Sequence, residues 1–105
     1  MKQEWLLIDM HTHSQYSKIN KKSDSKRVCE MGADKYVDIL ISNGVKIFSI
    51  TDHNYYSHKY YDEIDKYIKD NSLNIKIING VELDAYVELA DKTQDYIHIC
   101  VYFDD

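Results

Sequence analysis

The sequence predicts an α/β domain whose chain begins β-α-β-α-β and ends with two further strands. Two observations carry this prediction. Short, strand-sized apolar runs alternate with longer stretches of helical period, and turn residues separate several of them. The 105 residues fit one domain. They are too few for a closed (β/α)₈ barrel, which needs about 200 residues.

The first half of the chain supplies two of the expected strands and one helix. Residues 5–8 are continuously apolar between polar neighbours, which predicts a short buried strand, and residues 14–31 are polar, which predicts a long loop. Residues 33–43 are expected to form a helix, with Gly44 as its stop. The apolar stripe of this helix consists of Tyr36, Val37, Leu40 and Ile41. Residues 46–50 are expected to form a second buried strand.

The second half supplies another helix and three strands. Residues 58–71 have the spacing of an amphipathic helix, whose apolar residues are Tyr60, Ile64, Tyr67 and Ile68. Residues 75–78 read as a third strand, and a turn at 91–93 joins two more at 81–89 and 96–103. A β-α-β-α-β order predicts parallel strands with right-handed crossovers. Ligands are then expected beyond the carboxyl ends of these strands.

Composition limits the class of protein. Acidic residues outnumber basic ones by 18 to 13, and the net charge of −5 argues against a general nucleic-acid or anionic-membrane surface. A phosphate-bearing substrate stays compatible, because a bound divalent cation can be the largest local charge of a site. Cys29 and Cys100 are too few for a disulfide framework, and no apolar run approaches the ~20 residues of a membrane span. The N-terminus does not read as a signal peptide, so we expect a cytoplasmic protein.

A pair of histidines follows the first expected strand. His11 and His13 are two residues apart, so in an extended chain they point to the same side and can reach one centre. Neutral imidazole is the commonest protein ligand for metals. Asp9 lies on the same side, where its carboxylate could hold a ring N–H of such a ligand. The alternative is a pair of exposed or core histidines that bind no metal.

Carboxylates and a third histidine follow the next two expected strands. Asp52 and His53 come directly after residues 46–50, and Glu82 lies in an otherwise apolar stretch after residues 75–78. A buried Glu has to be paired, protonated or bound to metal. Ordinary alternatives stay open for each residue. Asp52 can start a turn or cap a helix, His53 can lie on the surface, and Glu82 can face outward from an edge strand.

The last expected strand adds a fourth contribution. His98, Cys100 and Tyr102 alternate with apolar residues, so the apolar side is expected to face the core and His98 the other side. That apolar side consists of Ile97, Ile99, Val101 and Phe103. Four strand ends that each deliver a His or a carboxylate together predict a divalent-metal site, for which Zn, Mn and Fe are all suitable. Cys100 is expected to pack rather than to bind metal.

Positive charge gathers in the polar segment after the histidine pair. The basic residues are Lys18, Lys21, Lys22, Lys26 and Arg27, and Asp24 is the acidic residue among them. One interpretation is a substrate-binding clamp that guides a phosphate or a nucleic-acid backbone to the metals. The other is a solvated loop.

These motifs resemble those of the PHP (polymerase and histidinol phosphatase) superfamily. The resemblance covers nearly the whole chain and rests on Asp-Met-His-Thr-His-Ser at 9–14, Ile-Thr-Asp-His-Asn at 50–54, Gly-Val-Glu at 80–82 and Ile-His-Ile at 97–99. It implies that residues 1–105 are the N-terminal portion of a single PHP-like domain. The fold would then be part of a distorted (β/α)₇ barrel that carries two or three Zn, Mn or Fe ions. Family members hydrolyse phosphomonoesters, or act as nucleases and as proofreading modules of bacterial DNA polymerases.

The resemblance also implies roles for individual residues. The implied ligands are His11 and His13 for one metal, Glu82 as a bridge between two metals, His98 for the second metal and His53 for a further one. Asp52 would contact the ligand residues without binding a metal itself. The candidate catalytic residues are Asp52 and Glu82. The substrate would be a phosphorylated small molecule or a nucleic acid.

Two departures from the family pattern bear on activity. Many members carry an Asp a few residues after the second His, where this chain has Lys18, and Asp24 can substitute only if the loop folds back. The later His motif and the Asp-x-His motif of the family's second half do not occur up to Asp105. We therefore expect a metal-dependent phosphoesterase or nuclease that needs further chain, a partner or an oligomer to complete its barrel. The alternative is a catalytically incomplete module that serves interaction or regulation in a larger DNA-related or defence assembly.

Overall fold

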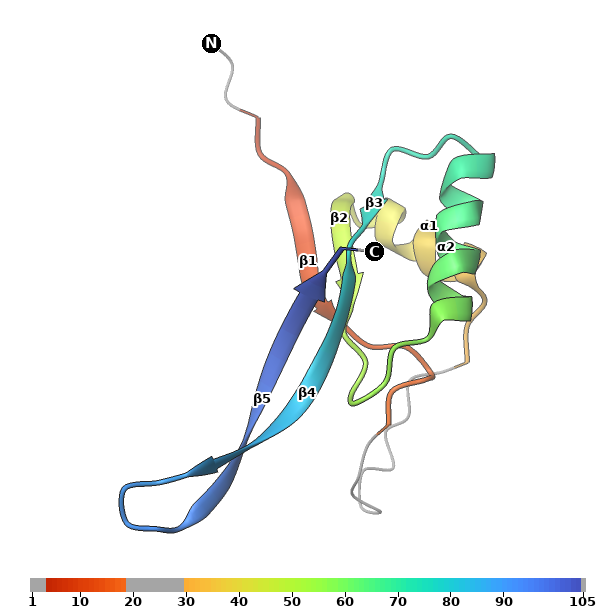
Figure 1. Ribbon diagram of the computed structural model, residues 1–105. Coiled ribbons are helices and arrows are strands. Elements are labelled where there is room, and N and C mark those ends of the chain that lie inside the picture. The colour runs from red at the N-terminus through yellow and green to blue at the C-terminus, as the bar shows by residue number, and fades with distance from the viewer. Residues whose placement is uncertain (1–3, 19–29, 105) are drawn as a thin grey trace.

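The computed structural model describes residues 4–18 and 30–104, which form a mixed α/β structure (Figure 1). Its elements are β1 (Leu7–Thr12), α1 (Ala33–Ser42), β2 (Val45–Ile50), α2 (His58–Asp70), β3 (Lys76–Ile77), β4 (Asn79–Glu88) and β5 (Gln94–Phe103). The first three strands form a parallel sheet in the order β1-β2-β3, and β4 and β5 form an antiparallel pair. The expected element order is therefore confirmed. Among the described residues the strands do not close into a barrel.

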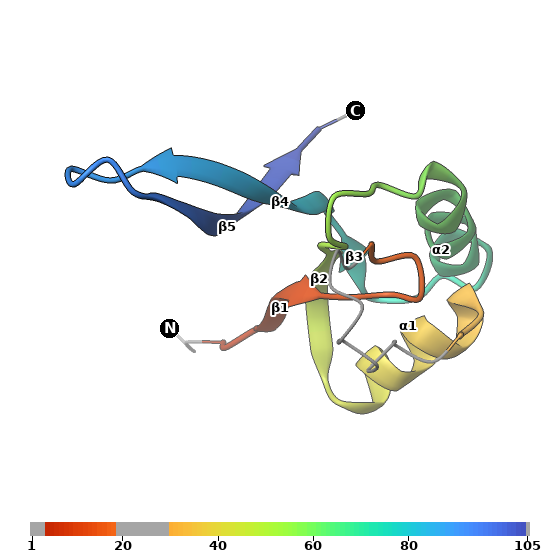
Figure 2. The ribbon, with the colours of Figure 1, turned by 90° about the horizontal axis from the view of Figure 1, so that it is seen from below.

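Both helices lie on the same side of the parallel sheet (Figure 2). This is the arrangement that two right-handed crossovers between consecutive neighbouring strands produce. The core lies between the helices and β2, where apolar side chains from all three elements are buried. Its fully buried members include Val37 of α1, Phe48 and Ile50 of β2, and Ile64 of α2. The sheet thus has a firmly packed central strand whose carboxyl end is held in place.

The two helices match their expected limits closely because their ends carry local signals. Gly44 follows α1 with a φ of +78°, a conformation that glycine adopts without steric cost. Ser57 precedes α2, and its side-chain oxygen accepts a hydrogen bond from the N–H of Tyr60 at 3.3 Å. Neither helix among the described residues is long and apolar enough to span a membrane.

The first strand differs from its prediction in both limits and burial. β1 starts at Leu7 and continues to Thr12, so His11 lies inside the strand. The expectation of a fully buried strand at 5–8 is wrong, since Leu7 is 54% exposed and Ile8 is 53% exposed. β1 lies at the edge of the sheet and pairs only with β2, while the helices pack mainly against β2 and β3. A continuous apolar run therefore predicts a strand here but does not predict that the strand is buried.

The β4–β5 hairpin projects away from the parallel sheet (Figure 1). Its register runs from Asn79 opposite Phe103 to Glu88 opposite Gln94. The expectation that the Ile/Val/Phe side of the last strand faces the core is wrong, since Ile97 is 46% exposed and Ile99 is 42% exposed. At the end of this side, Phe103 packs against the ring of Tyr56. The other face is turned to the parallel sheet.

Candidate metal centre

The carboxyl ends of β1 and β2 meet the start of β4 at one edge of the fold. The backbone N–H of Thr51, just after β2, donates to the carbonyl oxygen of Thr12 at 2.7 Å. The N–H of Glu82 in β4 donates to the carbonyl oxygen of Asp52 at 3.0 Å, and His53 forms a parallel bridge with Glu82. These bonds bring the His-x-His segment, the Asp-His segment and Glu82 together, as the sequence analysis expects for parallel strands.

Close packing at Gly80 fixes the position of β4. A Cβ atom built on Gly80 would lie 2.3 Å from Ser49 Oγ, so any other residue here would push β4 away from β2. The hydroxyl of Tyr61 in α2 accepts hydrogen bonds from the N–H groups of Gly80 and Ile50, each at 3.1 Å, and donates to the Ile50 carbonyl at 2.6 Å. Tyr61 thus ties α2 to both strands, two residues before Glu82.

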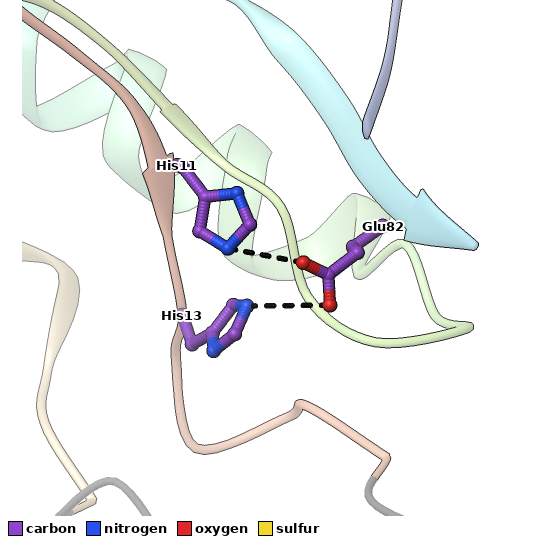
Figure 3. A group of neighbouring side chains, drawn as sticks. All are labelled: His11, His13 and Glu82. Carbon is purple, nitrogen blue, oxygen red and sulfur yellow. Dashed lines mark ion pairs between the residues drawn. The ribbon is translucent and has the colours of Figure 1, made fainter. Parts of the chain in front are cut away.

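Glu82 is the centre of the site. Its side chain is only 3% exposed. Oε1 lies 3.0 Å from Nε2 of His11, and Oε2 lies 3.9 Å from Nε2 of His13 (Figure 3). Nδ1 of His53 lies 2.6 Å from the same oxygen, Oε2, and Nδ1 of His98 lies 3.3 Å from it. One carboxylate therefore contacts four imidazoles, and its two oxygens face different members of the group.

The polar atoms at this centre are not satisfied by hydrogen bonds within the described residues. Glu82 Oε2 and His13 Nε2 are both buried, and neither makes a hydrogen bond of normal geometry there, because the contact of His53 Nδ1 with Oε2 at 2.6 Å is not aligned as one. Buried polar atoms normally have partners, so this convergence is costly unless another group binds it. His11, His13 and Glu82 each present one ligand atom within 4.8 Å of the others. Two imidazoles and a carboxylate make a donor set that fits a divalent cation such as Zn, Mn or Fe.

The protonation of His13 suits such a role. Burial lowers the pKa of His13, and the neighbouring His53 lowers it further. The ring is therefore neutral near pH 7, which is the form that binds metals. The backbone at His13 is held from the core, because the Tyr36 hydroxyl shares its proton between Thr12 Oγ1 at 2.8 Å and the His13 carbonyl oxygen at 3.2 Å.

Both carboxylate oxygens of Asp52 are occupied by hydrogen bonds from Ser14. Oδ1 accepts from the N–H of Ser14 at 2.6 Å, and Oδ2 accepts from its hydroxyl at 2.5 Å. Burial raises the pKa of Asp52, and these two hydrogen bonds act against that rise. Since Ser14 occupies both oxygens, Asp52 fixes the chain directly after His13. This contact supports the expected role of Asp52, which is to position the segment that carries a ligand without binding a metal itself.

Asp9, an expected contributor, and Cys100, which is expected only to pack, both contact His11. Asp9 accepts a hydrogen bond from the backbone N–H of His11 at 3.3 Å, whereas the sequence analysis expects a bond to an imidazole ring N–H. The sulfur of Cys100 lies 3.1 Å from Nδ1 of His11, on the opposite side of the ring from the nitrogen that faces Glu82. Tyr102, on the same face of β5, donates to the Met10 carbonyl at 2.5 Å and so connects β5 to β1.

Asp84 is a site residue that the sequence analysis misses. Its Oδ1 lies 3.5 Å from Nε2 of His98, and the two residues are opposite each other in the hairpin. His53, Asp84 and His98 form a second group of ligand atoms within 4.8 Å of one another. The feature that could have revealed Asp84 is the hairpin register, which puts it on the same face as Glu82 and His98.

The basic segment is described only in part. The N–H of Lys18 donates to the His53 carbonyl at 3.0 Å, and the Lys18 ammonium lies 4.7 Å from the centre of the Tyr55 ring. Lys18 is exposed, and its backbone lies beside His53. The other members of the predicted clamp, Lys21, Lys22, Lys26 and Arg27, lie outside the described residues.

Comparison with known proteins adds no assignment to this geometry. No protein-family model and no curated protein matches the chain.

Proposed function

We propose that this chain is the metal-binding portion of a PHP-type phosphoesterase or nuclease, and that further chain or a partner completes its barrel. The proposal rests on two independent supports. The first is the resemblance of the motifs at 9–14, 50–54, 80–82 and 97–99 to those of the superfamily. The second is the arrangement of four imidazoles around Glu82 at the carboxyl ends of parallel strands.

The contact set of Glu82 is the observation that carries the proposal. A buried carboxylate in a simple ion pair has one cationic partner and hydrogen bonds to its remaining lone pairs. Glu82 instead has His11 at Oε1 and three further imidazoles at Oε2, and Oε2 lacks a hydrogen bond. A carboxylate with ligand groups on both oxygens is suited to bridge two cations. Divalent ions in such a site activate water and offset the negative charge that develops on a phosphoester.

The chain's own residues have separable tasks in this proposal. His11, His13, His53, His98 and Glu82 hold the ions, and Asp52 fixes the segment after His13 through Ser14. The backbone of Lys18 lies beside His53, and its ammonium, which lies over the Tyr55 ring, is the cationic group that would bind an anionic phosphate group of the substrate. A phosphorylated small molecule and a nucleic-acid backbone both offer that group.

Hydrolysis of bis(p-nitrophenyl) phosphate in the presence of Mn²⁺ tests the proposal. The chain together with the segment or partner that completes its barrel should release p-nitrophenol, and Glu82→Gln should reduce the rate by at least about 100-fold, since a ligand shared by the ions is lost. Glu88→Gln changes an exposed acid further along β4 and should leave the rate unchanged. Equal rates for the chain and for Glu82→Gln would contradict the proposed role of the site.

A second candidate function is a catalytically incomplete PHP-like module that binds other proteins. The observation in its favour is that apolar side chains are exposed just before β1, at Trp5 and Leu6, and on one face of the hairpin, at Ile97. Contiguous exposed apolar surface is typical of interaction sites. Zinc binding without any hydrolysis in the test above would favour this module over the enzyme.

A further inference from the structure

A second group of ligand atoms lies near Oε2 of Glu82, whereas His11 faces Oε1. It consists of one atom each from His53, Asp84 and His98, all within 4.8 Å of one another. The rings of His53 and His98 meet edge to face, with their centres 5.3 Å apart. The motif resemblance assigns His53 and His98 to different metals and gives Asp84 no role, so this grouping comes from the structure alone.

Asp84 is held by a two-bond clamp from Asn54. The Nδ2 group of Asn54 donates to Oδ2 of Asp84 at 3.0 Å, and its Oδ1 accepts from the backbone N–H of Asp84 at 3.1 Å. Asn54 itself has a φ of +53°, and its N–H donates to the Glu82 carbonyl at 2.8 Å. The clamp uses one carboxylate oxygen and leaves the other oriented toward His98.

That second oxygen is buried and unsatisfied. Asp84 Oδ1 has no hydrogen-bond partner among the described residues. Its distance of 3.5 Å to Nε2 of His98 exceeds the ~2.7–2.9 Å of a charge-assisted hydrogen bond. His98 also faces Glu82 Oε2 through its other nitrogen, at 3.3 Å. Two carboxylates thus share the imidazole of His98, an arrangement that a cation between them would stabilise.

We propose that Asp84 is the third protein ligand of a second divalent-cation centre, which it shares with His53 and His98, and that Asn54 positions its carboxylate. The inference rests on the proposed function, because this centre lies next to the one at His11 and His13 and both face the carboxylate of Glu82. Two imidazoles and one carboxylate are a ligand set for Zn, Mn or Fe that leaves positions free for water or a substrate oxygen.

Equilibrium dialysis of the full chain against Zn²⁺, followed by metal analysis, tests the inference. The unmodified chain should bind two equivalents. Asp84→Asn should bind one equivalent tightly and lose the other, while retaining the acceptor oxygen that Asn54 uses. Asp95→Asn removes an exposed acid from β5 and should still bind two. His11→Ala/His13→Ala should retain the equivalent at Asp84.

A second variant protects the test against a folding defect. Asn54→Gly removes the clamp but tolerates the positive φ, so it should fold and weaken the second equivalent by roughly 10–100-fold, as loss of an outer partner does. Two equivalents of unchanged affinity in Asp84→Asn, or a single equivalent in the unmodified chain, would overturn the second centre and leave the proposed function standing. No zinc in the unmodified chain would overturn both.

Discussion

At the scale of single residues, the site depends on how each imidazole is oriented. His11 is contacted from both sides, with Cys100 Sγ 3.1 Å from Nδ1 and Glu82 Oε1 3.0 Å from Nε2. Metal-binding histidines usually hold their second ring nitrogen in a hydrogen bond, which fixes the tautomer and the ring orientation. The sulfur of Cys100 occupies the place of that partner.

Replacement of Cys100 should therefore weaken zinc binding without removing a ligand. We expect Cys100→Val to lower the zinc affinity about tenfold, the low end of the range for loss of such a partner. Cys100→Ser keeps a polar atom near Nδ1 and should restore most of the affinity. Competition with a chromogenic zinc chelator measures both. Unchanged affinity in Cys100→Val, or a sulfur-to-metal charge-transfer band with Co²⁺, would show that this role is wrong.

Asp84 shows why residue patterns alone miss part of a site. An acidic residue in an alternating strand normally faces solvent, so the sequence gives it no metal role. Only the hairpin register, which places Asp84 opposite His98, and the clamp from Asn54 reveal its contacts. The histidines and Glu82 were predictable because each follows or lies in an apolar strand, where such residues are unusual.

At the scale of elements, the site is positioned by α2 through Tyr61. Its hydroxyl is the acceptor for the N–H groups of Ile50 and Gly80 and the donor to the Ile50 carbonyl. The side chain is buried, so water does not replace these bonds easily. Each backbone group left unsatisfied costs about 1–3 kcal/mol.

Tyr61→Phe should accordingly destabilise the metal-free chain by about 2–4 kcal/mol, measured by urea unfolding. It should also weaken zinc binding, because β4 loses its anchor two residues before Glu82. Tyr67→Phe is the matched control. Tyr67 lies on the same helix as Tyr61, and its hydroxyl donates to Asp38 of α1 at an exposed site. The loss of this hydroxyl should therefore lower the free energy of unfolding by less than about 1 kcal/mol. Equal destabilisation by the two substitutions would contradict the anchoring role.

The elements also show which parts of the fold a sequence can predict. The two helices were predictable because their apolar period and end signals are local properties. The burial of β1 and of the last strand was not, because burial depends on which other elements cover a strand. An apolar run such as 5–8 indicates a strand in either case.

At the scale of the whole molecule, the described residues form a packed half and an open half. The helices bury one face of the parallel sheet, while the edge of β1 and the apolar face of the hairpin stay exposed (Figures 1 and 2). The partial barrel is therefore a proposal, supported by the parallel β1-β2-β3 order and the exposed apolar strands. The histidines lie at the boundary of these halves, where added chain or a partner can reach them.

The central claim is that a divalent cation binds at the carboxyl ends of these strands, and thermal unfolding with and without Zn²⁺ tests it most directly. A ligand at about 100 times its Kd stabilises a fold by about 2.7 kcal/mol, which corresponds to roughly 10 °C or more in Tm for a domain of this size. His58→Ala, which changes the exposed histidine of α2, should keep this shift. We predict that His11→Ala/His13→Ala loses the part of the shift that the centre at these histidines contributes and keeps only the part that the centre at Asp84 contributes. An equal rise in Tm for that variant and for the unmodified chain would contradict the account.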